Sequence, residues 1–225
     1  MAAEEDRQVL LYSYWRSSSA YRVRIALNLK GIDYRQSHVH LVKDGGEQNQ
    51  PGYRDINPLG LVPALVHNGQ TIVQSMAIIE YLEEVFTDKP LMPAGAVARA
   101  RVRSIAQSIC SEIQPLNNLA VLNFLKNRMQ QAGPEVKAWY THWIDRGFTA
   151  VETWLAAAPG DPFCHGESPG LADCFLVPQV YNAERFGCEL GAFPRICEVA
   201  ARCRSLAAFV QAAPENQADA PGAAN

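Results

Sequence analysis

The segment from Trp15 to Arg24 combines a hydroxyl cluster with arginines in a pattern suited to binding an anion. An apolar run, Val9 to Tyr14, has the composition of a strand, and apolar residues then recur at helical spacing from Val23 to Leu29. The serines at 17–19 therefore lie at a helix start, where unpaired backbone N–H groups and the helix dipole favour negative charge. The segment predicts either an ordinary serine cap or a site that stabilises a thiolate.

Two further dipeptides have the chemistry of a peptide-binding site. Val62-Pro63 precedes a predicted strand, and a proline there is compatible with a cis bond that exposes the Val62 backbone to an extended ligand. Gln74-Ser75 precedes a predicted helix, for which Ser75 is a good N-cap beside N–H groups that suit a carboxylate. Each of the two alone is as consistent with ordinary structure as with binding.

The elements that must position these residues form an α/β pattern in the first part of the chain. We expect strands near 8–14, 34–41, 63–67 and 70–73 and helices near 18–30 and 75–86. Gly31 ends the first helix, and Asn68-Gly69 is a strong hairpin signal that makes the strands it joins antiparallel. This part predicts a small mixed sheet covered by helices.

The rest of the chain has long amphipathic segments typical of an all-α domain. Helices are expected near 97–126, 134–157, 171–186 and 194–212, with a kink at Pro115 beside Gln114. We therefore predict a first domain over 7–90, a helical domain over 96–213 and a mobile tail over 214–225, which is rich in Ala, Pro and Gly.

Composition narrows the classes of partner. With 225 residues, 48% hydrophobic content and a net charge of −3, the chain supports a substantial core and shows no broad basic face for nucleic acid or membrane. An acidic N-terminus without a long apolar run predicts neither a signal peptide nor a membrane span, hence a cytoplasmic protein that binds small molecules.

The cysteines and histidines favour neither disulfides nor a metal. All six cysteines fall from residue 110 onward with no CxxC pair, so we expect reduced thiols, most of them buried. The five histidines are scattered without a ligand spacing, and no metal site is predicted.

Taken together, the motifs resemble the glutathione transferase family. The order is a serine turn after the first strand, Val-Pro before the third, Gln-Ser at the next helix, and then a helical half. Within that family, the sequence is most similar to the zeta class, and the similarity covers roughly residues 8–218. The segments that resemble this class are 16–27, 30–34, 57–58, 62–65, 74–82 and 176–186. The resemblance implies a thioredoxin-like α/β first domain, an all-α second domain, glutathione as cofactor and a homodimer.

The resemblance also assigns residues. It implies that Ser17, Ser18, Ser19, Ala20, Tyr21 and Arg22 line the thiol end of glutathione. Gln48 and the Val62 backbone would flank the cysteinyl part, and Gln74 with Ser75 would hold the γ-glutamyl end. Gln114, Asn118, Leu119 and Ala120 would close the site from the helical domain.

Two positions depart from the family pattern. Ser19 replaces the cysteine of Ser-Ser-Cys, and the first domain has no other cysteine, so the nucleophilic sulfur must belong to bound glutathione, with Ser17 as the activating hydroxyl. Gly170 replaces the Ser or Thr that caps the helix containing Asp173, although Asp173 still complements that helix start.

The reaction implied is glutathione-dependent cis–trans isomerisation of a dicarboxylated alkene by reversible thiolate addition. Arg16 and Arg185 match the family's substrate-carboxylate positions, and guanidinium groups bind carboxylates bidentately. Maleylacetoacetate is favoured over maleylpyruvate by the segment 117–122. Dehalogenation of α-halo acids and non-catalytic glutathione binding remain alternatives.

Overall fold

The structure is a computed structural model that describes residues 8–222, and it divides into two compact units. The first unit joins the N-terminal part of the chain, through Leu91, to the C-terminal segment from Leu206. The second unit is Met92–Ser205. Over the described residues, no helix is both long and apolar enough to cross a membrane.

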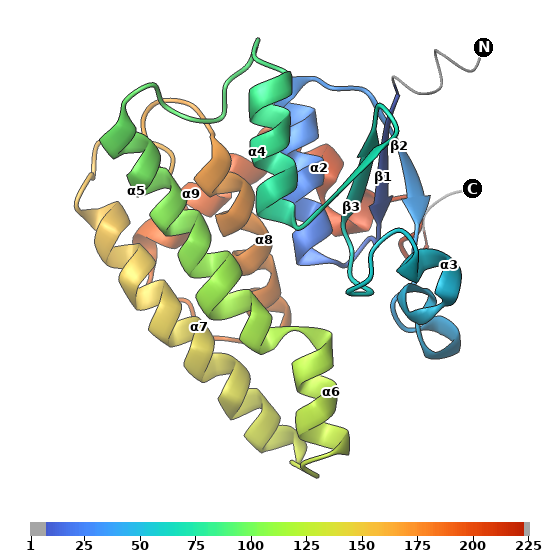
Figure 1. The fold of residues 1–225 in the computed structure, drawn as a ribbon. Coiled ribbons are helices and arrows are strands. Elements are labelled where there is room, and N and C mark those ends of the chain that lie inside the picture. The colour runs from blue at the N-terminus through green and yellow to red at the C-terminus, as the bar shows by residue number, and fades with distance from the viewer. Residues whose placement is uncertain (1–7, 223–225) are drawn as a thin grey trace. The chain divides into compact units, whose positions relative to one another are not determined.

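The first unit is built on a sheet with the strand order β2-β1-β3-β4 among its described residues (Figure 1). Its strands are β1 (Val9–Ser13), β2 (Tyr34–His38), β3 (Ala64–His67) and β4 (Gln70–Val73). β1 runs parallel to β2, with Val9 beside Tyr34, and antiparallel to β3, with Leu11 beside Leu65. The β3–β4 hairpin turns at Asn68-Gly69, where both residues have positive φ, as the sequence predicts.

Helices α2 (Ser18–Lys30) and α4 (Ser75–Val85) lie side by side against this sheet (Figure 1). Shorter elements, η1 (Lys43–Gly45), η2 (Glu47–Asn49) and α3 (Pro51–Arg54), connect β2 to β3. α2 ends at Gly31, whose φ of 66° lets its N–H reach the carbonyl oxygens of Leu27 and Asn28. The sheet and helices of the first unit therefore agree with the predicted α/β pattern.

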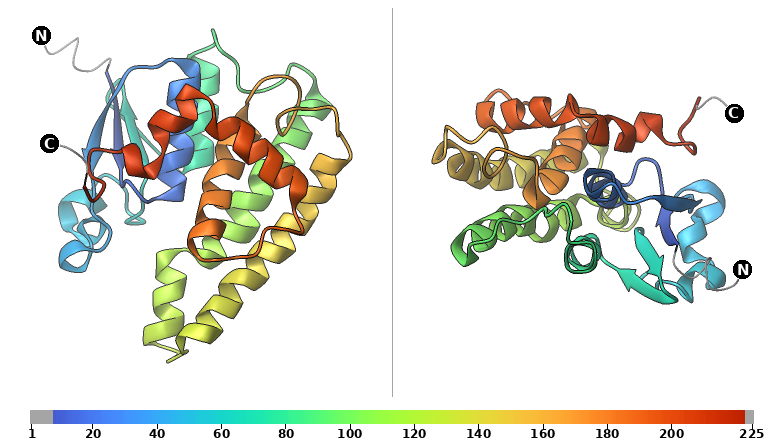
Figure 2. Two further views of the ribbon diagram at one scale, coloured as in Figure 1. Left: turned by 180° about the vertical axis from the view of Figure 1, so that it is seen from behind. Right: turned by 90° about the horizontal axis from the view of Figure 1, so that it is seen from above.

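The C-terminal segment differs from the prediction. We expected one helix over 194–212 in the helical domain and a mobile tail from 214. Instead, α9 (Pro194–Arg204) belongs to the second unit, whereas α10 (Ala207–Ala212) and η5 (Pro214–Asn216) belong to the first. α10 packs along α2 (Figure 2), so α2 is buried on nearly every side from Ala20 to Leu27.

In the second unit, Met92–Ser205, every element of regular secondary structure is a helix. It contains α5 (Ala96–Gln107), α6 (Leu119–Asn127), α7 (Gly133–Ala156) and α8 (Leu171–Arg185) in addition to α9. Between α5 and α6, a π-helical turn, η3 (Ser108–Ile113), leads into a 3₁₀ turn, η4 (Gln114–Asn117). The predicted kink is confirmed there, because Pro115 has no N–H to continue the helical ladder.

Candidate active site

The serine turn joins β1 to α2 and is fixed by its own hydrogen bonds. The Ser17 N–H donates to the Tyr14 carbonyl at 2.9 Å, and Ser17 takes an extended conformation as the N-cap of α2. Its Oγ accepts from the Ala20 N–H at 3.2 Å. Because a hydroxyl that accepts in this way keeps its own hydrogen for another partner, Ser17 can cap the helix and donate to a bound anion together.

The three serines differ in their exposure. Ser17 and Ser19 are half-buried, whereas Ser18 is buried. Ala20, Tyr21 and Arg22 follow in the first turns of α2 and are 0%, 3% and 1% exposed. All three are therefore less accessible than Ser17 and Ser19 at the same helix start.

Arg22 and Arg24 are both buried, and hydrogen bonds tie both side chains to other parts of the first unit. Arg22 Nη1 donates to Ser75 Oγ at 3.2 Å, which links α2 to the start of α4. Arg24 Nη2 donates to the Trp15 carbonyl at 3.0 Å and its Nη1 to Ser13 Oγ at 3.0 Å. Burial lowers the pKa of Arg24 to about 10, which still leaves its guanidinium charged at neutral pH.

The second helix start has a special backbone. Gln74 is exposed and has φ 73° and ψ 121°, a region that non-glycine residues seldom adopt. Gln74, not Ser75, occupies the N-cap position; this corrects the prediction for Ser75, whose hydroxyl instead accepts from Arg22. The free N–H groups of the first turn of α4 still suit a carboxylate.

Gln48 and Val62 lie in the loops that lead to β3. Gln48 is half-buried in η2, and its Nε2 donates to the Leu41 carbonyl at 3.3 Å. Val62 is 7% exposed and packs with Tyr14 and Tyr53 in one apolar cluster, and the Val62-Pro63 bond is cis. Just before Val62, the Leu61 carbonyl accepts from Tyr53 Oη and from Asn57 Nδ2, both at 2.7 Å. These bonds fix the backbone that leads into β3.

The remaining predicted site residues belong to the second unit. Gln114 begins η4, directly after the π-helical turn. Asn118 is the N-cap of α6, and its Oδ1 accepts from the Val121 N–H at 3.0 Å; the exposed Leu119 and Ala120 follow it. Arg185 ends α8, with its guanidinium carbon 4.5 Å from the centre of the Phe186 ring.

Asp173 takes the predicted place at the start of α8. Its carboxylate accepts from the Gly170 N–H at 2.8 Å and from the Cys164 N–H at 3.0 Å. It therefore satisfies the helix start that Gly170 cannot cap with a side chain. Burial raises the pKa of this carboxyl above its usual value.

The cysteines show no arrangement for metal binding or disulfide exchange. All six are free, and four are buried: Cys164, Cys174, Cys188 and Cys203. Burial raises the pKa of these thiols at Cys164, Cys188 and Cys203, which makes them poor nucleophiles. Within residues 8–222, no group of three or more His, Cys, Asp or Glu side chains is placed to hold a metal ion.

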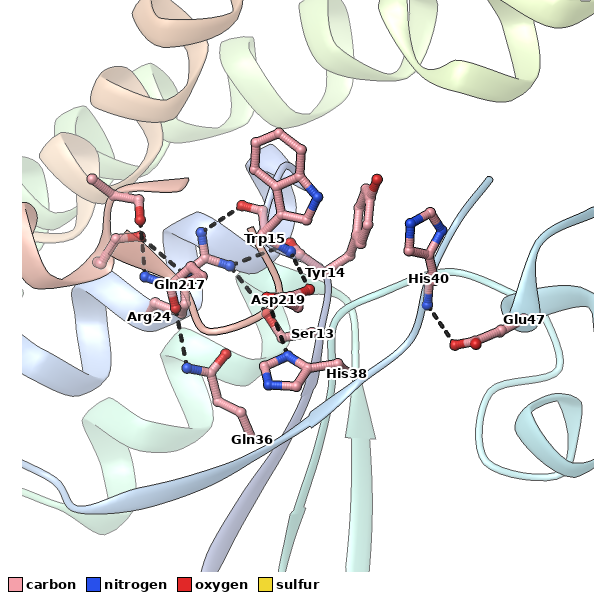
Figure 3. Close-up of polar contacts among 12 residues, drawn as sticks. Ser13, Tyr14, Trp15, Arg24, Gln36, His38, His40, Glu47, Gln217 and Asp219 are labelled. Atoms are coloured by element: carbon pink, nitrogen blue, oxygen red, sulfur yellow. Dashed lines mark hydrogen bonds and ion pairs between the residues drawn. The ribbon is translucent and has the colours of Figure 1, made fainter. Parts of the chain in front are cut away.

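One contact to the serine turn was not predicted from the sequence. Asp219, in the segment expected to be mobile, accepts from the Trp15 N–H at 2.9 Å, across 204 positions of the chain (Figure 3). No local pattern signals such a contact, because neither residue has a periodicity or spacing that relates it to the other.

Residues 7–84 match the family model described as "Glutathione S-transferase, N-terminal domain". That range includes the serine turn, Val62 and the start of α4, and the sheet with its helices is the fold of that domain. The two helix starts with free N–H groups suit the carboxylate and thiolate of a glutathione molecule.

Relatives that match nearly the whole chain show which class of the family it belongs to. The chain is 48% identical to a maleylacetoacetate isomerase of Pseudomonas aeruginosa, covering 95% of this chain and 99% of that one. It is similar to the holo structure of a maleyl pyruvate isomerase described as zeta class, with a TM-score of 0.91, 43% identity and 94% and 100% of the two chains covered. A maleylacetoacetate isomerase from Anaeromyxobacter dehalogenans, solved with GSH in its active site, matches with a TM-score of 0.84 and 43% identity over 95% and 98%. The chain belongs to the zeta class of the glutathione transferase family.

Proposed function

We propose that the protein is a glutathione-dependent cis–trans isomerase that converts maleylacetoacetate to fumarylacetoacetate. The observation that carries the proposal is Ser17, an N-cap whose hydroxyl hydrogen is left for a ligand, in a chain 48% identical to a maleylacetoacetate isomerase. Maleylpyruvate is the alternative substrate, favoured by the similarity to a solved maleyl pyruvate isomerase.

Glutathione, when bound, supplies a thiolate that adds reversibly to the cis double bond and leaves again once the bond has rotated. Ser17 donates its hydroxyl hydrogen to that sulfur, and the start of α2 adds the positive end of its dipole. Each pKa unit by which these groups lower the thiol pKa corresponds to about 1.4 kcal/mol of preference for the thiolate.

Other residues of the first unit hold glutathione in place. Gln74 and Ser75 bind the γ-glutamyl end at the start of α4, and Arg22, which the family resemblance assigns to the thiol end, donates to the Ser75 hydroxyl. Gln48 and the Val62 backbone bind the cysteinyl part. The positive φ of Gln74 stores strain of about 1–3 kcal/mol, a cost typical of backbone that serves a binding site.

Ser19 stands where the family pattern has a cysteine, and the chain has no cysteine before residue 110. The reacting sulfur is therefore that of glutathione, and Ser19 contributes a hydroxyl at the same helix start. Blocking the protein's own thiols should leave the reaction intact.

Two arginines bind the carboxylates of the substrate. Arg16 is half-buried at the serine turn, with its guanidinium carbon 5.5 Å from the centre of the Trp15 ring. Arg185, at the end of α8, is the second. Gln114, Asn118, Leu119 and Ala120 are the helical unit's contribution to binding. Beyond the site, we propose a homodimer, as the family resemblance implies, and a role for it in the cytoplasm in aromatic amino-acid breakdown.

The experiment is to follow turnover of maleylacetoacetate and maleylpyruvate by absorbance, with and without glutathione. Wild type is compared with Arg16→Ala and with Arg35→Ala, an exposed arginine of β2 that serves as the matched control. We expect glutathione-dependent turnover that falls at least tenfold in Arg16→Ala and stays unchanged in Arg35→Ala. Glutathione binding without turnover of either compound contradicts the proposal; an α-halo acid assay then separates a dehalogenase from a binding protein.

A further inference from the structure

The C-terminal segment is fastened to the first unit by bonds from residues far away in the chain. Asn28 Nδ2 donates to the Ala208 carbonyl at 2.9 Å, and Arg24 Nε donates to the Ala212 carbonyl at 3.0 Å. These bonds hold α10 along α2. They bring the chain after Ala212 to the end of the sheet at which β1 leads into the serine turn (Figure 3).

Gln217 then fixes the path of the chain toward Asp219. It is 4% exposed, and its Nε2 donates to the carbonyls of Gln211 and Ala213, both at 2.9 Å. Its Oε1 accepts from Gln36 Nε2 of β2 at 3.1 Å. The path of the chain as far as Gln217 is therefore fixed by contacts that do not include the serine turn.

Asp219 and Arg24 hold the same residue from its two sides. Asp219 Oδ2 accepts from the Trp15 N–H at 2.9 Å, and Arg24 Nη2 donates to the Trp15 carbonyl at 3.0 Å. The other carboxylate oxygen, Oδ1, lies 3.2 Å from His38 Nδ1. The Asp219 side chain is 14% exposed, so water competes little for its carboxylate oxygens.

The two bonds to Trp15 act on Ser17 through the turn that joins Tyr14 to Ser17. The Tyr14 carbonyl accepts from both the Ser17 N–H at 2.9 Å and Arg24 Nη1 at 3.4 Å. Trp15 lies inside that turn, so a shift of its amide displaces the Ser17 cap. We propose that Asp219 is a positioning residue for catalysis, which holds the Ser17 hydroxyl in place through the Trp15 N–H; this rests on the function proposed above.

The sign of its effect separates positioning from a direct effect of charge. A carboxylate near a bound thiolate disfavours that thiolate, so loss of the charge alone lowers the thiol pKa. Loss of the hydrogen bond instead lets the turn move, which weakens donation from Ser17 and raises the thiol pKa. A misplacement on the order of 1 Å can cost about a hundredfold in rate.

The test uses three substitutions of Asp219 in the full chain. Asp219→Asn keeps an oxygen for the Trp15 N–H but removes the charge, Asp219→Ala removes both, and Asp219→Glu keeps the charge on a side chain one methylene longer. His38→Ala is the matched control, since it removes the other partner of the carboxylate. The readouts are kcat, the KM for glutathione, and the pKa of enzyme-bound glutathione from the ultraviolet absorbance of its thiolate.

We expect Asp219→Ala to lower kcat about tenfold and to raise the thiol pKa by about one unit, on the order that a displaced donor gives. Asp219→Asn and His38→Ala should stay within about threefold of wild type, and Asp219→Glu should be impaired like the alanine variant. The proposal is overturned if Asp219→Asn and Asp219→Ala are impaired equally, or if both lower the pKa of the bound thiol. It is also overturned if Asp219→Glu behaves like wild type.

Two further outcomes are also decisive. If Asp219→Ala does not fold, the Asn and Glu variants alone give the answer, because both retain an oxygen acceptor. Wild type that lacks glutathione-dependent turnover refutes the proposed function itself. Wild type that turns over normally, with all three Asp219 variants equal to it, refutes the positioning role alone.

Discussion

Replacing Arg24 by methionine is expected to destabilise the protein by about 2–5 kcal/mol. The side chain is 0% exposed and donates to Ser13 Oγ and to the carbonyls of Trp15 and Ala212, each at 3.0 Å. A hydrogen bond to a charged group contributes about 1.5–3 kcal/mol. Burial lowers the pKa of Arg24 to about 10, so the fold disfavours the buried cation, and this offsets part of the loss.

The assay is urea denaturation of the full chain, followed by far-ultraviolet circular dichroism. In a separate thermal scan, each kcal/mol changes Tm by about 2–4 °C for a chain of this size, so a decrease of about 4–20 °C accompanies the loss. Arg24→Lys keeps the charge without the planar fork and should lose an intermediate amount. Arg35→Met, on the exposed side of β2, should change stability by less than about 0.5 kcal/mol. A loss for Arg24→Met no larger than that of the control shows that the buried Arg24 bonds do not stabilise the fold.

Three further predictions concern other parts of the chain. Gln74→Gly relieves the strain of a positive φ, so scanning calorimetry should show an unchanged or raised Tm. Because the glutamine side chain is lost, isothermal titration calorimetry should show weaker glutathione binding. A marked decrease in Tm contradicts this prediction. Asn118→Ala removes the cap bond to Val121 and should cost about 1 kcal/mol in urea denaturation, whereas Asn118→Asp should cost much less. Alkylation of the native protein with iodoacetamide should modify the half-buried Cys110 first and leave glutathione-dependent turnover intact; rapid inactivation contradicts the role given to Ser19.

Local signals in the sequence predicted much of the first unit. A serine at the start of α2, Gly31 as a helix end and Asn68-Gly69 as a hairpin turn each depend on the backbone of a few consecutive residues, and all three are found. The break at Pro115 has the same local origin, since a missing N–H interrupts a helix in any context.

Features set by distant residues were not predictable in this way. The C-terminal segment has the composition of a mobile tail, yet its place depends on partners such as Arg24 and Gln36, which lie 188 and 181 positions earlier. The start of α4 is a second feature that a distant residue decides. Serine is a common N-cap residue, but the hydroxyl of Ser75 accepts from the buried Arg22, and Gln74 takes the N-cap position. In both cases a tertiary contact overrides a local preference.

The fate of glutathione during maleylacetoacetate isomerisation tests the proposed mechanism most directly. Free thiol and isomer are measured together over many turnovers, with glutathione far below the substrate concentration. Because Ser17 serves a sulfur that is added and released in each cycle, we predict many turnovers per glutathione, an unchanged amount of free thiol, and a rate at least tenfold lower in Ser17→Ala. Consumption of one thiol per product, or a rate independent of glutathione, contradicts the account.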